Sequence, residues 1–273
     1  MTDTGPLFER TRILVGEDGV AALRAARVFL AGLGGVGSFA AEALARAGIG
    51  AITLVDHDRI AASNLNRQLP ALGSTLGRRK IEVMAERIRD INPACRLTLV
   101  EEFLSADNVP AQLAGGYDAV LDAIDSLASK TALIETAYRA GLPVVSSMGA
   151  GGRLDPTRLH VTDLQATRVC PLARAVRTQL RRRGVGRGIT AIWSDETPLP
   201  PLPPEDVGRG RPRAVNGTVS YVPALFGLTL AGVAIRRVLG FDSTLAAPLG
   251  GTTARRASAG VLRAADRDVR GSP

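Results

Sequence analysis

The chain has 273 residues, of which 45% are hydrophobic and 22% are charged. These proportions are typical of a globular protein with a sizeable core and exclude a fibrous or wholly disordered chain. Its two cysteines exclude a disulfide-stapled scaffold and a four-cysteine zinc module. The first residues lack a basic flank followed by an apolar core, so we expect no signal peptide and a cytoplasmic protein.

The charge is strongly basic and is carried almost entirely by arginine. There are 34 basic and 26 acidic residues, which give a net charge of +8, and Lys80 and Lys130 are the only lysines. Such a surplus of arginine is typical either of a genome-wide codon bias or of a polyanionic partner, because guanidinium groups match phosphate geometry. Charge alone does not choose between the two.

The first half of the chain alternates predicted strands and helices. Residues 1–26 predict a capping segment with an amphipathic helix. A short apolar run then predicts a buried parallel strand at 27–32, and further strands are predicted at 51–56, 96–100, 119–124 and 143–147. Helical periodicity or composition predicts helices at 36–47, 78–91 and 127–140. This repeated spacing predicts an α/β fold with a doubly wound, mostly parallel, Rossmann-like sheet.

The pattern weakens after residue 153. A strand is expected at 159–164, a basic helix at 171–183 and a long helix at 216–239. The apolar stretch of that last helix is too short for a membrane span, so we expect a buried core helix and no stable membrane insertion. Six prolines between 195 and 213 predict a mobile loop.

These patterns predict a domain organisation. We expect a single domain over 1–243, with a nucleotide-binding half at 1–153 and a substrate-facing half, the C-terminal extension, at 154–243. The tail at 244–273 is rich in alanine, glycine, serine and arginine, and such a composition predicts disorder.

A glycine-rich turn lies between the first predicted strand and the helix that follows it. In the run Gly-Leu-Gly-Gly-Val-Gly-Ser at 32–38, Gly32 permits a tight turn, Gly34 and Gly35 let the backbone approach phosphates, and Gly37 allows close helix packing. Asp56 ends the next strand, where a carboxylate accepts ribose hydroxyls. The order predicts an adenine nucleotide site, although glycines also serve turns that only pack a helix against a strand.

Two cations favour a triphosphate over the diphosphate of a dinucleotide. Arg67 and Lys80 follow Asp56 in the chain, and two additional positive charges suit a γ-phosphate and a leaving pyrophosphate. Taken singly, either residue is more often a solvated surface charge than a phosphate ligand. Asp122 and Asp125 end the fourth predicted strand, and we expect one of these carboxylates to hold Mg²⁺ against the phosphates.

Six segments in this order resemble the ubiquitin-activating-enzyme-like adenylating superfamily, which includes the ThiF, MoeB and HesA proteins. They are the runs at 32–37, 54–58, 63–68, 77–80, 91–93 and 122–126. Further segments are most similar to one branch, whose members dehydrate threonylcarbamoyladenosine in tRNA. These are the runs at 42–54, 82–89, 149–157, 161–164 and 216–220.

The resemblance implies roles for individual residues. Asp56 looks like the ribose-binding acid, with Asp58 in the same nucleotide-binding set. The catalytic and phosphate-side residues would be Arg67, Lys80, Asn64 and Gln68, with Asp125 as the carboxylate associated with Mg²⁺. Arg10 is similar to an N-terminal arginine that reaches into the ATP site of the partner subunit, which implies a homodimer.

The implied reaction is an ATP-dependent loss of water. A carboxylate is a poor electrophile, and transfer of AMP turns it into an acyl-adenylate with a good leaving group. The substrate would be tRNA that carries threonylcarbamoyladenosine beside the anticodon. Ring closure by a neighbouring atom gains from proximity, so no protein nucleophile is needed.

Two other functions stay open from the sequence. One is adenylation of the C-terminus of a ubiquitin-like sulfur-carrier protein, and the other is a nucleotide-binding scaffold without chemistry. A sulfur-transfer partner and a bound monovalent cation also stay open.

The remaining motifs are less specific. Cys95 is expected to be a small buried residue, the position of Cys170 before Pro171 allows either burial or exposure, and neither is expected to be a nucleophile. Trp193 suits either core packing or base stacking, and His57 suits a loop. The glycines at 149–152 suit either a nucleoside contact or a tight turn.

Arginines are concentrated in the second half of the chain and predict a contact with the tRNA backbone, with a solvated face as the alternative. They are Arg177, Arg181, Arg182 and Arg183 on the basic helix and Arg209 and Arg211 on the proline-rich loop.

Overall fold

The computed structural model describes residues 5–205 and 213–241. Its main sheet contains seven strands: β1 Arg27–Ala31, β2 Ala51–Val55, β3 Arg96–Val100, β4 Ala119–Asp122, β5 Val144–Ser147, β6 Leu159–Asp163 and β7 Thr190–Ser194. They lie in the order β3-β2-β1-β4-β5-β7-β6. All neighbours are parallel except β6 and β7, which confirms the predicted mostly parallel α/β sheet. The order reverses between β1 and β4, and ligands bind at such switch points, outside the carboxyl ends of the strands.

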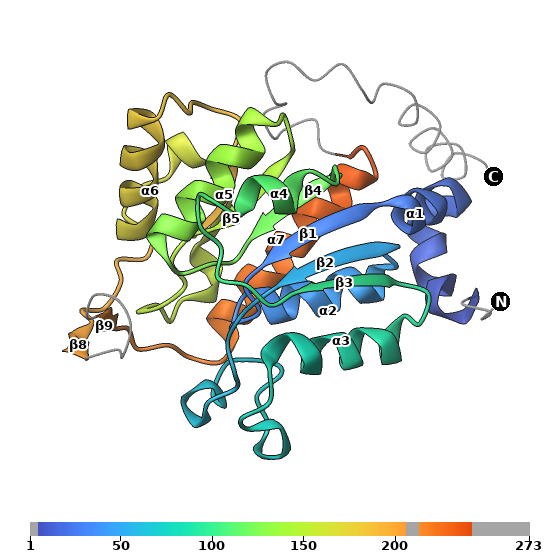
Figure 1. Cartoon of the computed structure of the whole chain (residues 1–273), viewed down its shortest axis with the longest axis horizontal. Coiled ribbons are helices and arrows are strands. Elements are labelled where there is room, and N and C mark those ends of the chain that lie inside the picture. The colour runs from blue at the N-terminus through green and yellow to red at the C-terminus, as the bar shows by residue number, and fades with distance from the viewer. Residues whose placement is uncertain (1–4, 206–212, 242–273) are drawn as a thin grey trace, which may run out of the picture.

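Helices cover both faces of the sheet (Figure 1). The helices α2 Gly37–Ala47, α3 Lys80–Ile91 and α7 Tyr221–Val238 pack on one face. The helices α4 Val109–Leu113, α5 Leu127–Arg139 and α6 Pro171–Arg182 pack on the other. Val28 and Leu30 of β1 point into the first layer, whereas Phe29 and Ala31 point into the second. Because alternate side chains enter opposite layers, a central strand must be apolar throughout, as the sequence runs indicated.

The last helix, α7, is a core element. Among the described residues it is the one helix whose length and composition would also suit a membrane span. Its buried residues pack against the sheet and against α2, and a Cβ on Gly227 would lie 2.2 Å from the carbonyl oxygen of Val36. The prediction of a buried helix is confirmed, but the helix begins at Tyr221 instead of residue 216. Residues 217 and 218 accept hydrogen bonds from two other loops instead of continuing the helix.

Parts of the secondary structure differ from the prediction. The segment predicted as a mobile loop at 195–213 contains the strand β8 Leu202–Glu205, which pairs antiparallel with β9 Arg213–Val215 at the end of that segment. Both strands are edges of a two-stranded ribbon, so a proline that lacks an N–H group is tolerated there. β7 and α4 were not predicted. Helix α1 Gly5–Ala25 is kinked at Gly16, whose φ of 70° is not helical.

Candidate functional site

The glycine turn connects β1 to α2 at the carboxyl end of the sheet. Gly32 has a φ of 88°, and a Cβ there would lie 2.7 Å from the carbonyl oxygen of Ala123. A Cβ on Gly37 would lie 1.7 Å from the carbonyl oxygen of Gly32. Only glycine fits either position, so the turn brings the N-terminus of α2 close to the end of β1. Backbone N–H groups and the helix dipole at such a terminus favour an anion.

Asp56 directly follows β2 and contacts the glycine turn through its carboxylate. Its carboxylate accepts hydrogen bonds from the backbone N–H of Leu33 at 2.6 Å and of Asp58 at 2.8 Å. Burial raises the pKa of Asp56 above its usual value, although Lys80 and the two N–H groups act in the opposite direction. The Lys80 ammonium is buried and lies 2.7 Å from Oδ2 of Asp58. A carboxylate and an ammonium therefore flank the glycine turn.

The loop between β2 and α3 places a second group of polar side chains against the same glycines. A Cβ on Gly34 would lie 3.7 Å from Nε2 of Gln68, and one on Gly35 would lie 3.5 Å from Cγ of Arg67. The Arg67 guanidinium donates to the carbonyl oxygen of Ser63 at 2.7 Å. Asn64 is buried, and its Oδ1 accepts from the N–H of Ala61 at 3.1 Å. The side chains expected at the phosphates therefore lie beside the glycine turn.

Asp122, the last residue of β4, and Asp125, in the loop that follows, are in different environments. Asp122 is fully buried and pairs with the fully buried Lys130 at 2.5 Å. Lys130 also donates to the carbonyl oxygen of Ser147 at 2.9 Å, and the N–H of Ile124 donates to Asp122 at 3.1 Å. Asp125 is exposed at the end of this loop. Of the two, only Asp125 is accessible to a metal ion that is shared with a substrate.

A second group of possible metal ligands lies beside the turn. Ligand atoms of Asp56, His57 and Asp58 all lie within 4.8 Å of one another. The Lys80 ammonium already neutralises Asp58, and both oxygens of Asp56 accept backbone hydrogen bonds. A cation at this position would meet a positive charge, so Asp125 is the better metal ligand. His57 is a half-exposed loop residue, as predicted, with its ring against Phe103.

Arg10 lies at the opposite end of the sheet from the glycine turn. Phe8, on the same helix, packs against Gly48, which follows the last residue of α2. α2 begins at the glycine turn and has 11 residues, so it separates Phe8 from the turn by about 16 Å. Figure 1 shows α1 at the far end of the strands from the loops that follow β2. The exposed Arg10 side chain is therefore remote from the site of its own chain.

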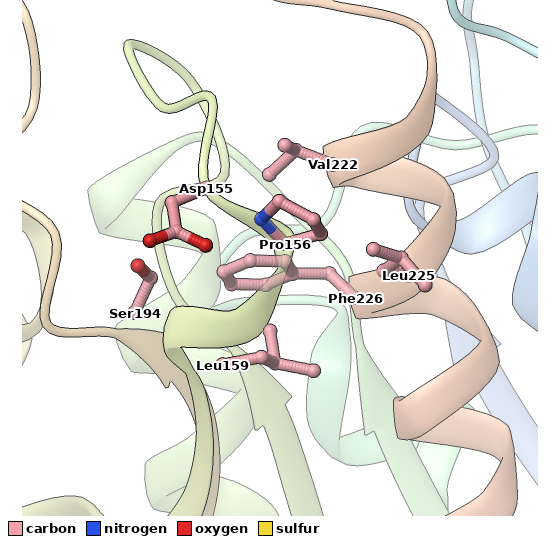
Figure 2. A pocket seen from close by; sticks show the side chains of 7 residues that line it. All are labelled: Asp155, Pro156, Leu159, Ser194, Val222, Leu225 and Phe226. Carbon is pink, nitrogen blue, oxygen red and sulfur yellow. The ribbon is translucent and has the colours of Figure 1, made fainter.

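A shallow cleft lies beside the first turns of α7. Figure 2 shows its lining, which is formed by Asp155, Pro156, Leu159, Ser194, Val222, Leu225 and Phe226. Val222 precedes Pro223, and Pro223 lies 3.1 Å from the position of a Cβ on Gly35. The glycine turn and this cleft therefore border the same end of α7.

Comparison with known proteins agrees with this geometry. The model of the ThiF family matches residues 8–267. The chain belongs to the ThiF family.

Within the ThiF family, similarity to one group of enzymes covers most of the chain. The chain is 37% identical over 241 residues to tRNA threonylcarbamoyladenosine dehydratase of Bacillus subtilis, which covers 85% of this chain and 94% of that protein. The crystal structure of the dehydratase of Escherichia coli in complex with ATP is 41% identical and superposes with a TM-score of 0.81, over 88% of this chain and 97% of that one. Molybdopterin-synthase adenylyltransferase of Escherichia coli is 38% identical over 150 residues, 54% of this chain and 59% of that protein.

The arginines of the predicted tRNA footprint differ from one another in exposure and in hydrogen-bond partners. Arg182 is exposed, but Arg177 is partly buried and donates to the carbonyl oxygen of Thr167 at 2.9 Å. Arg181 donates to Gln165 at 3.0 Å, and Arg183 pairs with Glu135 at 2.8 Å. Arg209 and Arg211 lie outside the described residues.

Both cysteines of this ThiF protein are buried. Cys170, whose exposure the sequence left open, is 2% exposed: it directly precedes α6, and its Sγ lies 3.6 Å from the position of a Cβ on Gly149. Burial raises the pKa of Cys95 to about 11. Trp193 is a core residue whose indole N–H donates to Thr162 at 2.9 Å. Neither thiol is accessible as a nucleophile.

Three residues at the site escaped the sequence analysis. Asn66 donates to the carbonyl oxygen of Thr218 at 2.9 Å and joins the phosphate-side loop to the start of α7. Lys130 is fully buried, and its rarity was a usable signal, because a chain with 34 basic residues contains only two lysines. Arg153 follows the glycines at 149–152 and is 3% exposed. Its place next to a glycine run was visible, but its burial was not.

Proposed function

We propose that this chain adenylates the carboxylate of threonylcarbamoyladenosine beside the anticodon of tRNA and so drives its closure into a ring with loss of water. The observation that carries the proposal is similarity to the dehydratases over 85% of the chain. Similarity to the molybdopterin-synthase adenylyltransferase covers 54% of the chain. The dehydratases therefore match a larger part of the chain than that adenylyltransferase does.

The residues around the glycine turn suit the first step. The N-terminus of α2 and the side chain of Arg67 would hold the phosphates, and Asp56 would accept the ribose hydroxyls. A carboxylate oxygen of the substrate attacks the α-phosphorus, the bond to the bridging oxygen breaks, and pyrophosphate leaves with that electron pair. Lys80 and Arg67 stabilise the negative charge that develops on the leaving group.

The second step needs no protein nucleophile. A neighbouring atom of the threonylcarbamoyl group attacks the acyl carbon and loses its proton, and AMP leaves with the former carboxylate oxygen. The water that the substrate loses thus appears in AMP and pyrophosphate. Both thiols of the chain are buried, and the intramolecular attack gains from proximity alone.

Mg²⁺ and a second copy of the chain would complete this site. Asp125 would hold Mg²⁺, because Mg²⁺ favours one or two carboxylates together with phosphate oxygens. When bound, the ion neutralises phosphate charge. Arg10 would act in the partner's site, since its own site lies beyond α2. Ile13 and Leu14 are 75% and 81% exposed on the same helix, which suits burial in a homodimer.

The test is a reaction with a defined product. Purified protein, ATP and Mg²⁺ are incubated with tRNA that carries threonylcarbamoyladenosine, and the nucleosides are analysed by mass spectrometry. We expect a nucleoside that is lighter by one water, formed with AMP and pyrophosphate and only when ATP is present. Turnover of a ubiquitin-like sulfur-carrier protein without action on tRNA would instead assign the chain to carrier activation.

A further inference from the structure

The turn that follows β5 holds a buried arginine whose hydrogen bonding is incomplete. Arg153 is 3% exposed, and its Nη1 donates to the carbonyl oxygens of Gly149 at 2.5 Å and Gly151 at 3.0 Å. Its Nε and Nη2 are also buried, and neither has a hydrogen-bond partner among the described residues. Guanidinium groups stay charged at any physiological pH, so burial with open donors is costly unless a ligand completes the set.

The open donors form one edge of the guanidinium. The Nε–H and one Nη2–H of arginine point in parallel, and this pair is the fork that binds a carboxylate or a phosphate through two hydrogen bonds. The third nitrogen, Nη1, is fixed by two backbone carbonyls, which holds the plane of the group. The edge thus has the geometry to bind one planar or tetrahedral oxyanion. Both of its nitrogens are buried, so a ligand would reach them only when the groups packed around the edge move apart.

Residues 216–218 link the turn that holds Arg153 to the nucleotide site. Arg67, beside Gly35, adjoins Asn66, and Asn66 donates to Thr218. Thr218 Oγ1 in turn lies 3.5 Å from the position of a Cβ on Gly151. Residues 216–218 therefore separate Arg153 from the phosphate-side loop, and the arginine lies at the end of β5, beyond the switch point between β1 and β4.

We propose that the Nε and Nη2 edge of Arg153 binds the carboxylate of the acceptor, the group that is to be adenylated. This inference rests on the function proposed above. In the proposed function, Arg67, Lys80 and the start of α2 bind the nucleotide phosphates. The carboxylate of the acceptor still needs a cation of its own. A carboxylate held by this fork keeps a second lone pair on each oxygen for attack on phosphorus.

The chemistry predicts which kinetic constant depends on Arg153. The carboxylate loses its negative charge as it bonds to phosphorus, so the pairing is strongest before reaction. Loss of an interaction made with the bound substrate raises KM more than it lowers kcat. Arg153→Gln should therefore raise KM for modified tRNA by about ten-fold or more and leave KM for ATP within about two-fold.

A binding experiment tests the inference without turnover. The full chain is titrated with an anticodon stem-loop RNA that carries threonylcarbamoyladenosine, and with the same RNA in which that carboxylate is a methyl ester. We expect the wild type to bind the acid at least about ten-fold more tightly. Arg153→Gln should bring the ratio close to one, and Arg153→Lys, which keeps the charge without the fork, should give an intermediate ratio. Arg158→Gln, an exposed control whose partner is Asp195, should match the wild type.

The possible results separate this inference from the proposed function. A wild type that dehydrates tRNA, together with an Arg153→Gln variant that keeps the acid preference, would overturn the inference alone. Arg153→Gln that weakens ATP binding and keeps the preference would also overturn it, because Arg153 would then bind a phosphate. A wild type that neither dehydrates tRNA nor prefers the acid would overturn both. If Arg153→Gln unfolds, Arg153→Lys decides through the same ratio.

Discussion

Both lysines of the chain are buried, in a protein whose other basic residues are arginines. Lys80 is 5% exposed and Lys130 is not exposed at all. At both positions a compact ammonium meets a carboxylate at short range, and a guanidinium is larger and planar. Lys130 joins Asp122 at the end of β4 to Ser147 at the end of β5. It therefore fixes the starts of two loops, one with Asp125 and the other with Arg153.

Removing the charge of Lys130 should destabilise the fold. Lys130→Met leaves the carboxylate of Asp122 buried without its cation, and we expect the free energy of unfolding to fall by about 3–5 kcal/mol. Urea denaturation followed by circular dichroism measures the change. Arg46→Met, which breaks an exposed pair with Glu42, should cost at most about 1 kcal/mol. Equal effects of the two variants would contradict this account of Lys130.

The state of Asp56 should make nucleoside binding sensitive to acid. Burial raises the pKa of Asp56, and only the ionised carboxylate has both oxygens free of a proton. As the pH falls, Asp56 should protonate at a higher pH than an ordinary aspartate, and affinity for adenosine should fall with it. Calorimetric titration with adenosine avoids the titration of phosphate. The exposed control Asp107→Asn should keep this pH dependence, and Asp56→Asn should abolish it.

At the scale of elements, the sequence predicted the strands whose limits follow from the local pattern of apolar residues. β1, β2 and β3 are short runs rich in apolar residues, and their limits agree with the prediction within one residue. β7 was missed because its five residues become a strand only by pairing with β5 and β6, which lie far away in the sequence. The same holds for single residues at the site: the burial of Cys170 and Arg153 depends on contacts between distant loops.

The helix α6 offers an element-scale test of the tRNA footprint. Arg181 and Arg182 lie in its exposed last turn. Reversal of both charges, Arg181→Glu with Arg182→Glu, should weaken tRNA binding and reduce the slope of log affinity against log salt by about one to two. Filter binding over a salt series measures it. Arg89→Glu, an exposed reversal on α3, should change the slope less, and an unchanged slope in the α6 variant would remove this helix from the interface.

At the scale of the whole molecule, Arg10 and the glycine turn occupy opposite ends of the sheet. If two chains share each site, a site needs Arg67 from one chain and Arg10 from the other. Arg10→Ala and Arg67→Ala should each be inactive alone. Mixed and exchanged, they should recover roughly a quarter of wild-type turnover, because half the dimers are hybrids and each hybrid has one intact site. No recovery despite subunit exchange, verified by native mass spectrometry, would place Arg10 outside the partner's site.

Because both lysines are buried, proteolysis after lysine can measure how often the folded chain opens. A protease that cuts only after lysine has two target bonds in all 273 residues, and the folded chain presents neither side chain to it. Cleavage by such an enzyme would follow the population of opened molecules. Its rate, with and without ATP, would then measure how strongly the nucleotide holds α3 and α5 closed.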